Sequence, residues 1–297
     1  MGIKRLSIIT PTYNRGYILE NLYNSLCNQT ILDFEWIVVD DGSCDNTSEI
    51  VRTWERQGKI DMIYIEQKNG GKHRAINNGI KYVNNEYVYI LDSDDYLLNN
   101  AVERIYLWIR SIDGLDNFAG ISGLRGYDAK NRIGNFPENV KYVDCTNMDR
   151  IKKDLQGDKA EIYKTDLLKK YPFPEFDGEN FLPENAVWNK LSLDGYKVRW
   201  FGEIIHICNY LEDGLTKKNG DERVLLNFEG YSYVEKINIK GLVFPYNYLA
   251  IGRYVKRAYK KGLSKLDILK KMEISNFEYL LGRIIELLNS KYKKVKR

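Results

Sequence analysis

Three carboxylates stand within four residues at the end of the stretch Tyr87-Val88-Tyr89-Ile90-Leu91-Asp92-Ser93-Asp94-Asp95. The apolar and aromatic residues before them favour a buried strand, so the acidic residues are expected at its carboxyl end. Ligands of open α/β sheets bind at that end. Neighbouring carboxylates repel one another unless a cation joins them, and Mg²⁺ and Mn²⁺ take oxygen ligands. The stretch indicates either a divalent-metal site or a solvated turn, because Asp and Ser are also common turn residues.

Other predicted strands also end in polar residues. The strand 6–10 leads to Pro11-Thr12-Tyr13-Asn14, the strand 35–39 to Asp40-Asp41-Gly42-Ser43, and the strand 62–65 to Asn69-Gly70-Gly71-Lys72-His73. Helical patterns separate these strands, and such alternation predicts a parallel sheet with right-handed crossovers. The carboxyl ends of parallel strands share one edge, so several polar turns meeting there favour a ligand site over a chance turn.

The bulk composition fits a globular α/β protein. The chain has 297 residues, of which 43% are hydrophobic, enough for one large α/β domain or a domain with an appendage. The four cysteines are far apart and form neither metal-type spacing nor a dense disulfide framework, which suits a reducing cytosol. A signal peptide and an apolar span of membrane length are not recognised in the sequence. We therefore expect a cytoplasmic protein.

Charge is unevenly distributed along the chain. Residues 251–297 hold 14 Lys or Arg against 4 Asp or Glu, a net charge of +10, whereas the rest of the chain has a net charge of −6. This tail contains the apolar helical pattern Leu280, Leu281, Ile284, Ile285 and Leu288. A basic amphipathic helix can lie on an anionic membrane leaflet, or it can pack on the rest of the protein. We do not expect nucleic-acid binding, because no recognised binding motif is present.

The four polar motifs, in their order and spacing, resemble the nucleotide-sugar-binding part of glycosyltransferase family 2. The resemblance is clear over about residues 4–115 and looser to about residue 215. It implies the GT-A fold, a Rossmann-like, mostly parallel sheet flanked by helices, with a C-terminal helical extension. The expected domains are a GT-A domain at 1–220, divided into a nucleotide-sugar-binding half (1–115) and an acceptor half (116–220), and a basic helical extension at 221–297.

The resemblance also implies which residues surround the nucleoside, most often uridine. These are Thr10, Pro11, Tyr13 and one of the pair Asp40 and Asp41. A carboxylate accepting a hydrogen bond from the uracil ring or a ribose hydroxyl is sensible chemistry. The alternative is that Thr10 only ends a strand and Asp40-Asp41-Gly42 is only a turn.

Lys72 opens a predicted helix after two glycines. Backbone N–H groups at a helix start favour anions, and a lysine adds a full charge, so Lys72 is expected at the base or the diphosphate. A solvated lysine is the alternative. Asn77 and Arg74 are further candidates. His73 is expected to orient a neighbour or face solvent, not to bind metal.

By the same resemblance, Asp92-Ser93-Asp94 is the Asp-x-Asp motif of the family. Asp92 would contact the ribose or bridge to the metal by water, with Ser93 beside it, and Asp94 would bind Mn²⁺ or Mg²⁺. Asp95 offers a neighbouring carboxylate. His206 is expected to be a strand residue and not a third metal ligand. The metal would neutralise the leaving nucleoside diphosphate as a Lewis acid.

The resemblance further implies inverting glycosyl transfer by single displacement, which requires a carboxylate base for the acceptor hydroxyl. The family supplies it at a helix start, and the corresponding residue here is Glu184, with Glu179 and Asp177 as further candidates. Asn185 stands where the family often has an aspartate, and an amide cannot accept the proton. Glu184 as a simple helix cap is the alternative. Residues 210–215 would form a loop that closes over the diphosphate.

We therefore expect an inverting, metal-dependent glycosyltransferase that moves a sugar from a UDP-sugar to a hydroxyl of a glycan or lipid-linked acceptor. Bacterial surface polysaccharide synthesis is the expected setting, with the protein cytoplasmic or peripheral on the inner face of the membrane. One rival is a nucleotidyltransferase, which would need a basic, Gly-rich loop where Pro11-Thr12-Tyr13-Asn14 stands. The other is a non-catalytic nucleotide-sugar-binding scaffold, which predicts binding without turnover.

Overall fold

The computed structural model describes residues 5–209 and 220–295 and forms two compact units. The first unit comprises Met1–Phe173 and Gly195–Gly214, and the second comprises Pro174–Asp194 and Leu215–Arg297. The segment 174–194, expected within the acceptor half, therefore packs with the C-terminal helices.

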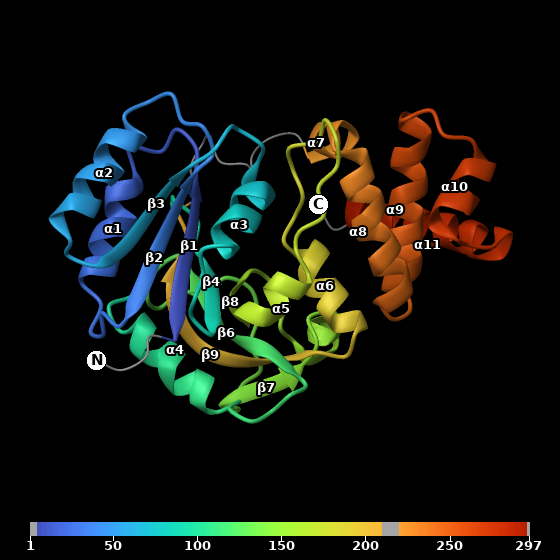
Figure 1. Cartoon of the computed structure of the whole chain (residues 1–297). Coiled ribbons are helices and arrows are strands. Elements are labelled where there is room, and N and C mark those ends of the chain that lie inside the picture. The colour runs from blue at the N-terminus through green and yellow to red at the C-terminus, as the bar shows by residue number, and fades with distance from the viewer. Residues whose placement is uncertain (1–4, 210–219, 296–297) are drawn as a thin grey trace. The chain divides into compact units, whose positions relative to one another are not determined.

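A nine-stranded sheet organises the first unit, in the order β3-β2-β1-β4-β8-β6-β9-β5 with β7 paired to β9 (Figure 1). The strands are β1 (Leu6–Thr12), β2 (Phe34–Asp40), β3 (Asp61–Glu66), β4 (Tyr87–Ile90), β5 (Tyr96–Leu97), β6 (Phe118–Gly126), β7 (Tyr142–Cys145), β8 (Lys159–Lys164) and β9 (Lys197–Ile207). Strands β1 to β4 run parallel, as predicted, and β8 enters antiparallel between β4 and β6. The predicted fold class, an α/β protein with a mostly parallel sheet flanked by helices, is confirmed.

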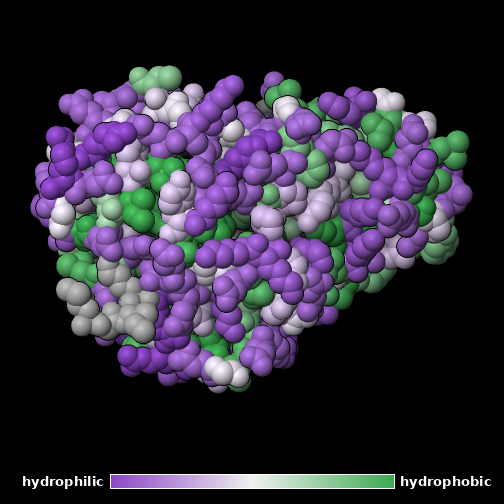
Figure 2. Space-filling view, in the orientation of Figure 1, coloured by the Kyte–Doolittle hydropathy of each residue, from purple (hydrophilic) through white to green (hydrophobic). Residues whose placement is uncertain are grey.

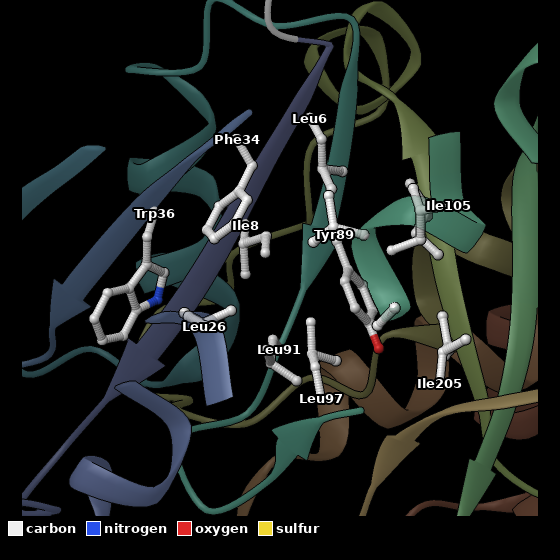
Figure 3. Close-up of a cluster of buried hydrophobic side chains, with 14 of the residues drawn as sticks. Leu6, Ile8, Leu26, Phe34, Trp36, Tyr89, Leu91, Leu97, Ile105 and Ile205 are labelled. Carbon is white, nitrogen blue, oxygen red and sulfur yellow. The ribbon is translucent and has the colours of Figure 1, made fainter. Parts of the chain in front are cut away.

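Helices cover both faces of this sheet. Figure 1 shows α1 and α2 on one side of β1 to β3 and α3 on the other. The helices of the first unit are α1 (Leu19–Cys27), α2 (Thr47–Gln57), α3 (Lys72–Ile80), α4 (Ala101–Arg110) and α5 (Thr165–Lys170), with a 3₁₀ helix at Met148–Lys153. Alternate residues of β1, β2 and β4 pack with α1, α2 and α4 in one apolar core, which fixes the strand register (Figure 3). On the other face, Gly79 lets α3 approach Ile9 and Val39 closely.

A glycine lies within the longest strand, β9, which runs without a break from Lys197 to Ile207. A Cβ at Gly202 would lie 2.7 Å from the ring of Phe136, so glycine allows the strand to pass under that ring. Gly202 therefore serves close packing.

The second unit is helical. Its helices are α6 (Asn185–Leu193), α7 (Gly220–Leu226), α8 (Phe228–Gly241), α9 (Tyr246–Lys260), α10 (Lys265–Met272) and α11 (Asn276–Val295). Phe228, Tyr254 and Ile268 belong to an apolar core that joins α8, α9 and α10. Within the described part of the chain, no helix is long and apolar enough to cross a bilayer.

Candidate active site

The predicted polar turns meet at one edge of the sheet. Thr12, the last residue of β1, pairs with Asp40 at the end of β2, and the N–H of Asp41 donates to the carbonyl of Thr12 at 2.8 Å. On the other side of β1, the N–H of Leu91 donates to the carbonyl of Ile9 at 2.9 Å. Parallel pairing thus brings the Asp40-Asp41 turn and the acidic turn that begins at Asp92 to the same edge, as expected from the sequence.

Asp41 is the centre of a hydrogen-bond cluster with the turn before α3. Its carboxylate accepts from the backbone N–H groups of Gly70 and Gly71, each at 2.8 Å. It also accepts from the side-chain amides of Gln67 at 2.8 Å and Asn69 at 3.2 Å. With two donors on each oxygen and only 4% of the residue exposed, Asp41 fixes the conformation of the turn that presents Lys72.

Asp40 is also buried but has fewer partners. Its carboxylate accepts from the N–H of Ser43 and the hydroxyl of Tyr64, both at 2.8 Å. Burial, with Asp40 and Glu66 nearby, raises the pKa of Tyr64, so the phenol remains a donor. The two carboxylates are thus held in fixed orientations by different neighbours.

Lys72 connects the two turns. As the first residue of α3, it forms an ion pair with Asp92 through Nζ and Oδ1. Burial opposes ionisation of Asp92, but Lys72 and Arg125 outweigh it and lower the pKa of Asp92. The site therefore contains a lysine and an ionised carboxylate side by side.

The pKa of Asp94 is shifted in the opposite direction from that of Asp92. Burial, followed by repulsion from Asp92 and Asp95, raises the pKa of Asp94 to about 6. Such repulsion is what a divalent cation relieves, and three carboxylates are ligands that Mg²⁺ and Mn²⁺ accept. The donor set of the acidic turn therefore fits a divalent metal, and Asp94 is the carboxylate with most to gain from it.

Asp95 is tied into the protein interior. Its Oδ2 lies 2.6 Å from Nε2 of His206, and its Oδ1 accepts from the N–H of Asn209 at 3.0 Å. Nη1 of Arg125 lies 3.8 Å from Oδ2 of Asp95. His206, predicted to be a strand residue, lies in β9 and is fully buried. Cys208 lies close enough to Asp95 and His206 for the three side chains to hold a metal ion. The Asp95 carboxylate is, however, already engaged by His206 and by the N–H of Asn209.

Several other candidates have structural contacts. Thr10 is fully buried, and its hydroxyl accepts from the indole N–H of Trp36 at 2.9 Å. The amide of Asn77 both donates to and accepts from the backbone of Phe173. Arg74 donates to the carbonyl of Gly70 at 2.7 Å. His73 is only 2% exposed, so of the two expected roles, orienting a neighbour or facing solvent, the second is excluded.

The remaining nucleotide candidates differ in exposure. Pro11 and Ser93 are buried, whereas Tyr13 is 48% exposed just beyond the end of β1. The next residue, Asn14, has a positive φ, and its side chain accepts from the N–H of Cys44 at 2.8 Å. This contact joins the turn after β1 to the turn after β2.

Glu179 caps a helix of the second unit. Its carboxylate accepts from the N–H groups of Glu229 and Gly230, at 2.7 and 2.8 Å, in the first turn of α8. In return, Asn227 accepts from the N–H groups of Asn180 and Phe181. The carboxylate satisfies helix donors and complements the helix dipole, so Glu179 has a clear structural role.

The other two base candidates have different surroundings. Glu184 immediately precedes α6 and makes no side-chain capping hydrogen bond, and Asp177 is exposed in the preceding turn. The side-chain oxygen of Asn185 is buried without a hydrogen-bond partner among the residues that the structure describes. The start of α6 thus offers a carboxylate beside an unsatisfied amide. The loop expected at 210–215 lies outside the described residues.

Sequence reasoning missed Tyr64 and Arg125 as contacts of the acidic residues. Tyr64 reaches Asp40 from the neighbouring strand, and Arg125 reaches Asp95 from β6. No motif marks these two residues, because each is brought in by the folding of the sheet over a long sequence separation. The contact of Tyr89 with His206 was missed for the same reason, although Tyr89 itself lies in the acidic motif stretch.

Comparison with known proteins identifies relatives of this site. The model of the family described as "Glycosyl transferase family 2" matches residues 7–171, more than half of the chain. The poly(ribitol-phosphate) beta-N-acetylglucosaminyltransferase TarP of Staphylococcus aureus is 33% identical over 132 residues, which are 44% of this chain and 39% of TarP. Chondroitin synthase of Escherichia coli is 34% identical over 194 residues, which are 60% of this chain and 28% of the synthase. The matches therefore span well under two thirds of these relatives.

Solved structures share the fold. The structure of S. aureus TarS 1–349 in complex with UDP-GlcNAc has a TM-score of 0.64 and 20% identity, covering 94% of this chain and 79% of that one. The mannosyltransferase PcManGT of Pyrobaculum calidifontis, in complex with GDP-Man and Mn²⁺, has a TM-score of 0.54 and 14% identity, covering 94% and 73%. At such identities, the likeness establishes the architecture alone.

Proposed function

The chain belongs to glycosyl transferase family 2, and from this premise we propose that it is an inverting glycosyltransferase that uses a nucleotide-diphosphate sugar, a UDP-sugar in the first instance. The observation that carries the proposal is the gathering of the Asp40-Asp41 turn, Lys72 and the acidic turn at Asp92 to Asp95 at one sheet edge. The TarS complex with UDP-GlcNAc, which has the same fold, supports a uridine nucleotide as the donor.

In this proposal the donor is held by groups of different charge. Asp40 or Asp41 accepts from the nucleoside, with Thr10, Pro11 and Tyr13 around it. We assign Lys72 to the diphosphate for two reasons. Its ammonium lies at this sheet edge, where it pairs with Asp92. Lys72 also begins a helix, and backbone N–H groups at a helix start favour anions. Asp92, beside Ser93, is ionised by Lys72 and can accept from a ribose hydroxyl.

Asp94 would be the principal ligand of Mn²⁺ or Mg²⁺, with Asp92 beside it. A divalent ion there supplies Lewis-acid stabilisation of the negative charge that develops on the leaving diphosphate. Asp95 was expected as a third metal carboxylate, and we now assign it mainly to orienting the turn, since His206 and Asn209 already bind it.

Glu184 is the proposed general base. In the single displacement, the acceptor oxygen forms a bond to the anomeric carbon while the bond from that carbon to the diphosphate oxygen breaks. The hydroxyl proton passes to the Glu184 carboxylate, and the nucleoside diphosphate leaves with the electron pair. Glu184 is preferred to Glu179, because the Glu179 carboxylate is occupied in capping α8. Asp177 is exposed and remains the second candidate.

The acceptor is proposed to be a hydroxyl of a glycan or a lipid-linked glycan in bacterial surface polysaccharide synthesis, with the enzyme in the cytoplasm. This rests on the relatives: one matched protein of Campylobacter jejuni is named GalNAc(5)-diNAcBac-PP-undecaprenol beta-1,3-glucosyltransferase and is 29% identical over 194 residues.

The test is a screen of nucleotide sugars with Mn²⁺ or Mg²⁺, read as nucleoside-diphosphate release. We expect the wild-type protein to turn over one donor and Asp94→Ala to lose at least about a hundredfold in rate, as for removal of a group that stabilises the transition state. Asp116→Ala, at an exposed position outside the site, is the matched control and should keep the wild-type rate. Equal rates in wild type and Asp94→Ala would refute the metal assignment, and donor binding without any turnover would favour the scaffold.

A further inference from the structure

Helix α11 presents an exposed apolar face. Its members are large side chains spaced three or four residues apart, so they line one side of the helix. These six residues, called the α11 stripe here, are Phe277, Leu280, Ile284, Leu287, Leu288 and Tyr292. Their exposed fractions range from 45% for Ile284 to 69% for Phe277. Single exposed apolar residues are ordinary, but six on one helix face mark an interaction surface.

The opposite face of α11 is already occupied within the second unit. A Cβ at Gly282 would lie 2.6 Å from the side chain of Ile251, and one at Gly252 would lie 2.4 Å from Glu286. The two glycines therefore let α9 and α11 pack closely, and Tyr279 is buried at the same contact region. Because α11 is seated on α9 by this face, the α11 stripe is the outward face of a packed helix.

The stripe belongs to a strongly basic part of the chain. The described helices α9 to α11 and the turns between them carry many exposed basic residues, namely Arg253, Lys256, Lys260, Lys261, Lys265, Lys270, Arg283 and Lys291. Some of these are in local contacts: Lys260 pairs with Asp221, and Arg253 lies 3.6 Å from Glu235. The net charge of residues 251–297 is nevertheless +10. Figure 2 shows this mixture of hydrophilic and hydrophobic surface over the C-terminal helices.

The charge decides which occupant fits. A second copy of the chain, docked stripe to stripe, would bring two strongly basic regions together, and such repulsion opposes association. An anionic bilayer surface instead matches both properties, because it accepts apolar side chains at the acyl boundary and attracts Lys and Arg at the headgroups. We propose that the α11 stripe docks on an anionic lipid surface, with α11 lying in the plane of the interface.

The length and composition of the stripe fit this geometry. From Phe277 to Tyr292 an α-helix extends about 23 Å, long enough for an in-plane contact. Lys291 lies among the apolar side chains near one end, where its long stem can reach toward the headgroups. The docking surface goes beyond the proposed transfer reaction and needs neither donor nor acceptor.

The test is vesicle flotation of the full chain without nucleotide sugar. Vesicles of phosphatidylcholine with about one-third phosphatidylglycerol are compared with vesicles of phosphatidylcholine alone. We expect binding to the anionic vesicles only. The variant Ile284→Asp with Leu288→Asp should lose binding at least about tenfold, because it places charge in the acyl boundary. Both positions are exposed, so the fold should persist, and the melting temperature checks this.

The matched control is Tyr82→Asp with Leu107→Asp, two positions of the first unit that are 46% and 47% exposed. This control should bind anionic vesicles as the wild type does. Three outcomes would overturn the proposal: no vesicle binding, equal binding to neutral vesicles, or wild-type binding by the stripe variant. Sedimentation velocity tests the alternative occupant, which is a second copy of the chain. If the wild type forms a dimer that the stripe variant abolishes, and neither binds vesicles, the face is assigned to a second copy. Failure here leaves the donor assay unaffected.

Discussion

His206 and Asp95 form a buried pair in which Nε2 of the imidazole lies 2.6 Å from Oδ2 of the carboxylate. Nδ1 of the same ring lies 2.6 Å from the hydroxyl of Tyr89. Burial and the nearby Arg125 lower the pKa of His206, while Asp95 opposes them. A neutral ring then donates from Nε2 to Asp95 and accepts at Nδ1 from Tyr89. One imidazole thus joins β4 and β9 to the acidic turn.

Removing this imidazole should affect how the acidic turn uses metal. With His206→Ala, Asp95 loses a buried donor, and the turn that carries Asp92 and Asp94 loses an anchor. Because groups that orient metal ligands typically change metal affinity or activity 10- to 100-fold, we expect the Mn²⁺ concentration for half-maximal turnover to rise by about that factor. The measurement is nucleoside-diphosphate release against Mn²⁺ concentration.

Tyr89→Phe is the graded companion to that variant. It keeps the ring and removes only the donor to Nδ1, so we expect a loss of about 1 kcal/mol in unfolding free energy and a smaller shift in Mn²⁺ dependence. If His206→Ala lowers the melting temperature but leaves the Mn²⁺ dependence unchanged, the histidine only stabilises the fold and does not position the turn.

Asp41 should be required for the shape of the turn before α3. An asparagine keeps the size of the side chain but turns an NH₂ group toward donors that the carboxylate accepts, among them the N–H groups of Gly70 and Gly71. Buried donors left unsatisfied typically cost about 1–3 kcal/mol, and we expect Asp41→Asn to lower the unfolding free energy by that amount. It should also weaken UDP binding in calorimetry, because Lys72 would no longer be held. Asp116→Asn, at an exposed site, should change neither quantity.

The sequence predicts the strand ends of the site well, and the reason is local. Each motif follows a strand directly, so its position at the sheet edge depends only on strand direction, and β1 to β4 are indeed parallel. The direction of β8 relative to its neighbours does not follow from the sequence, because a strand followed by a helix has the same residue pattern in either direction. The structure places β8 antiparallel between β4 and β6.

Contacts that cross long stretches of sequence were also missed. His206 lies 111 residues from Asp95, and Glu179 caps a helix that begins about 50 residues later. In the tail, the predicted apolar pattern included Leu281 and Ile285, which the structure leaves only partly exposed. It did not include the exposed residues Phe277, Leu287 and Tyr292. Packing on α9 decides which apolar residues of α11 face outward, and a single helix sequence does not contain that information.

Lys159 should give the folded protein a distinct pH dependence. Its side chain is almost fully buried, and its ammonium donates to the carbonyl of Gln156 at 2.7 Å. Burial, followed by Arg150, lowers the pKa of Lys159 from 10.5 to about 8. Between these two values the unfolded chain binds more protons than the folded one, so this group makes stability rise with pH in that window. Below pH 8 Lys159 is charged in both the folded and the unfolded chain, so burying its charge destabilises the fold to the full extent.

The measurement is urea unfolding of wild type and Lys159→Met at several pH values from 7 to 9.5. Other titrating groups, including the buried tyrosines, are shared by both proteins, so the difference in unfolding free energy isolates Lys159. We expect this difference to shift in favour of the wild type as the pH rises above 8. A difference that stays constant across the window contradicts the lowered pKa.

The assignment of the base leads to opposite expectations for two neighbouring glutamates. Glu184→Gln should keep donor affinity and lose transfer by about 10²–10⁴-fold, because an amide cannot accept the acceptor proton. Glu179→Gln should instead lower the unfolding free energy by about 0.5–2 kcal/mol, since it weakens the cap on Glu229 and Gly230 at the start of α8. Transfer by the folded fraction of that variant should stay near the wild-type rate.

The two variants control for each other, because both replace a carboxylate by an amide of the same size within the same segment. Transfer assays, donor calorimetry and urea unfolding on both proteins separate a chemical role from a structural one. Retained transfer in Glu184→Gln would move the base to Asp177, which the same substitution to asparagine then tests. Loss of transfer in Glu179→Gln, with unfolding unchanged, would show that the capping contacts at α8 are not the function of that carboxylate.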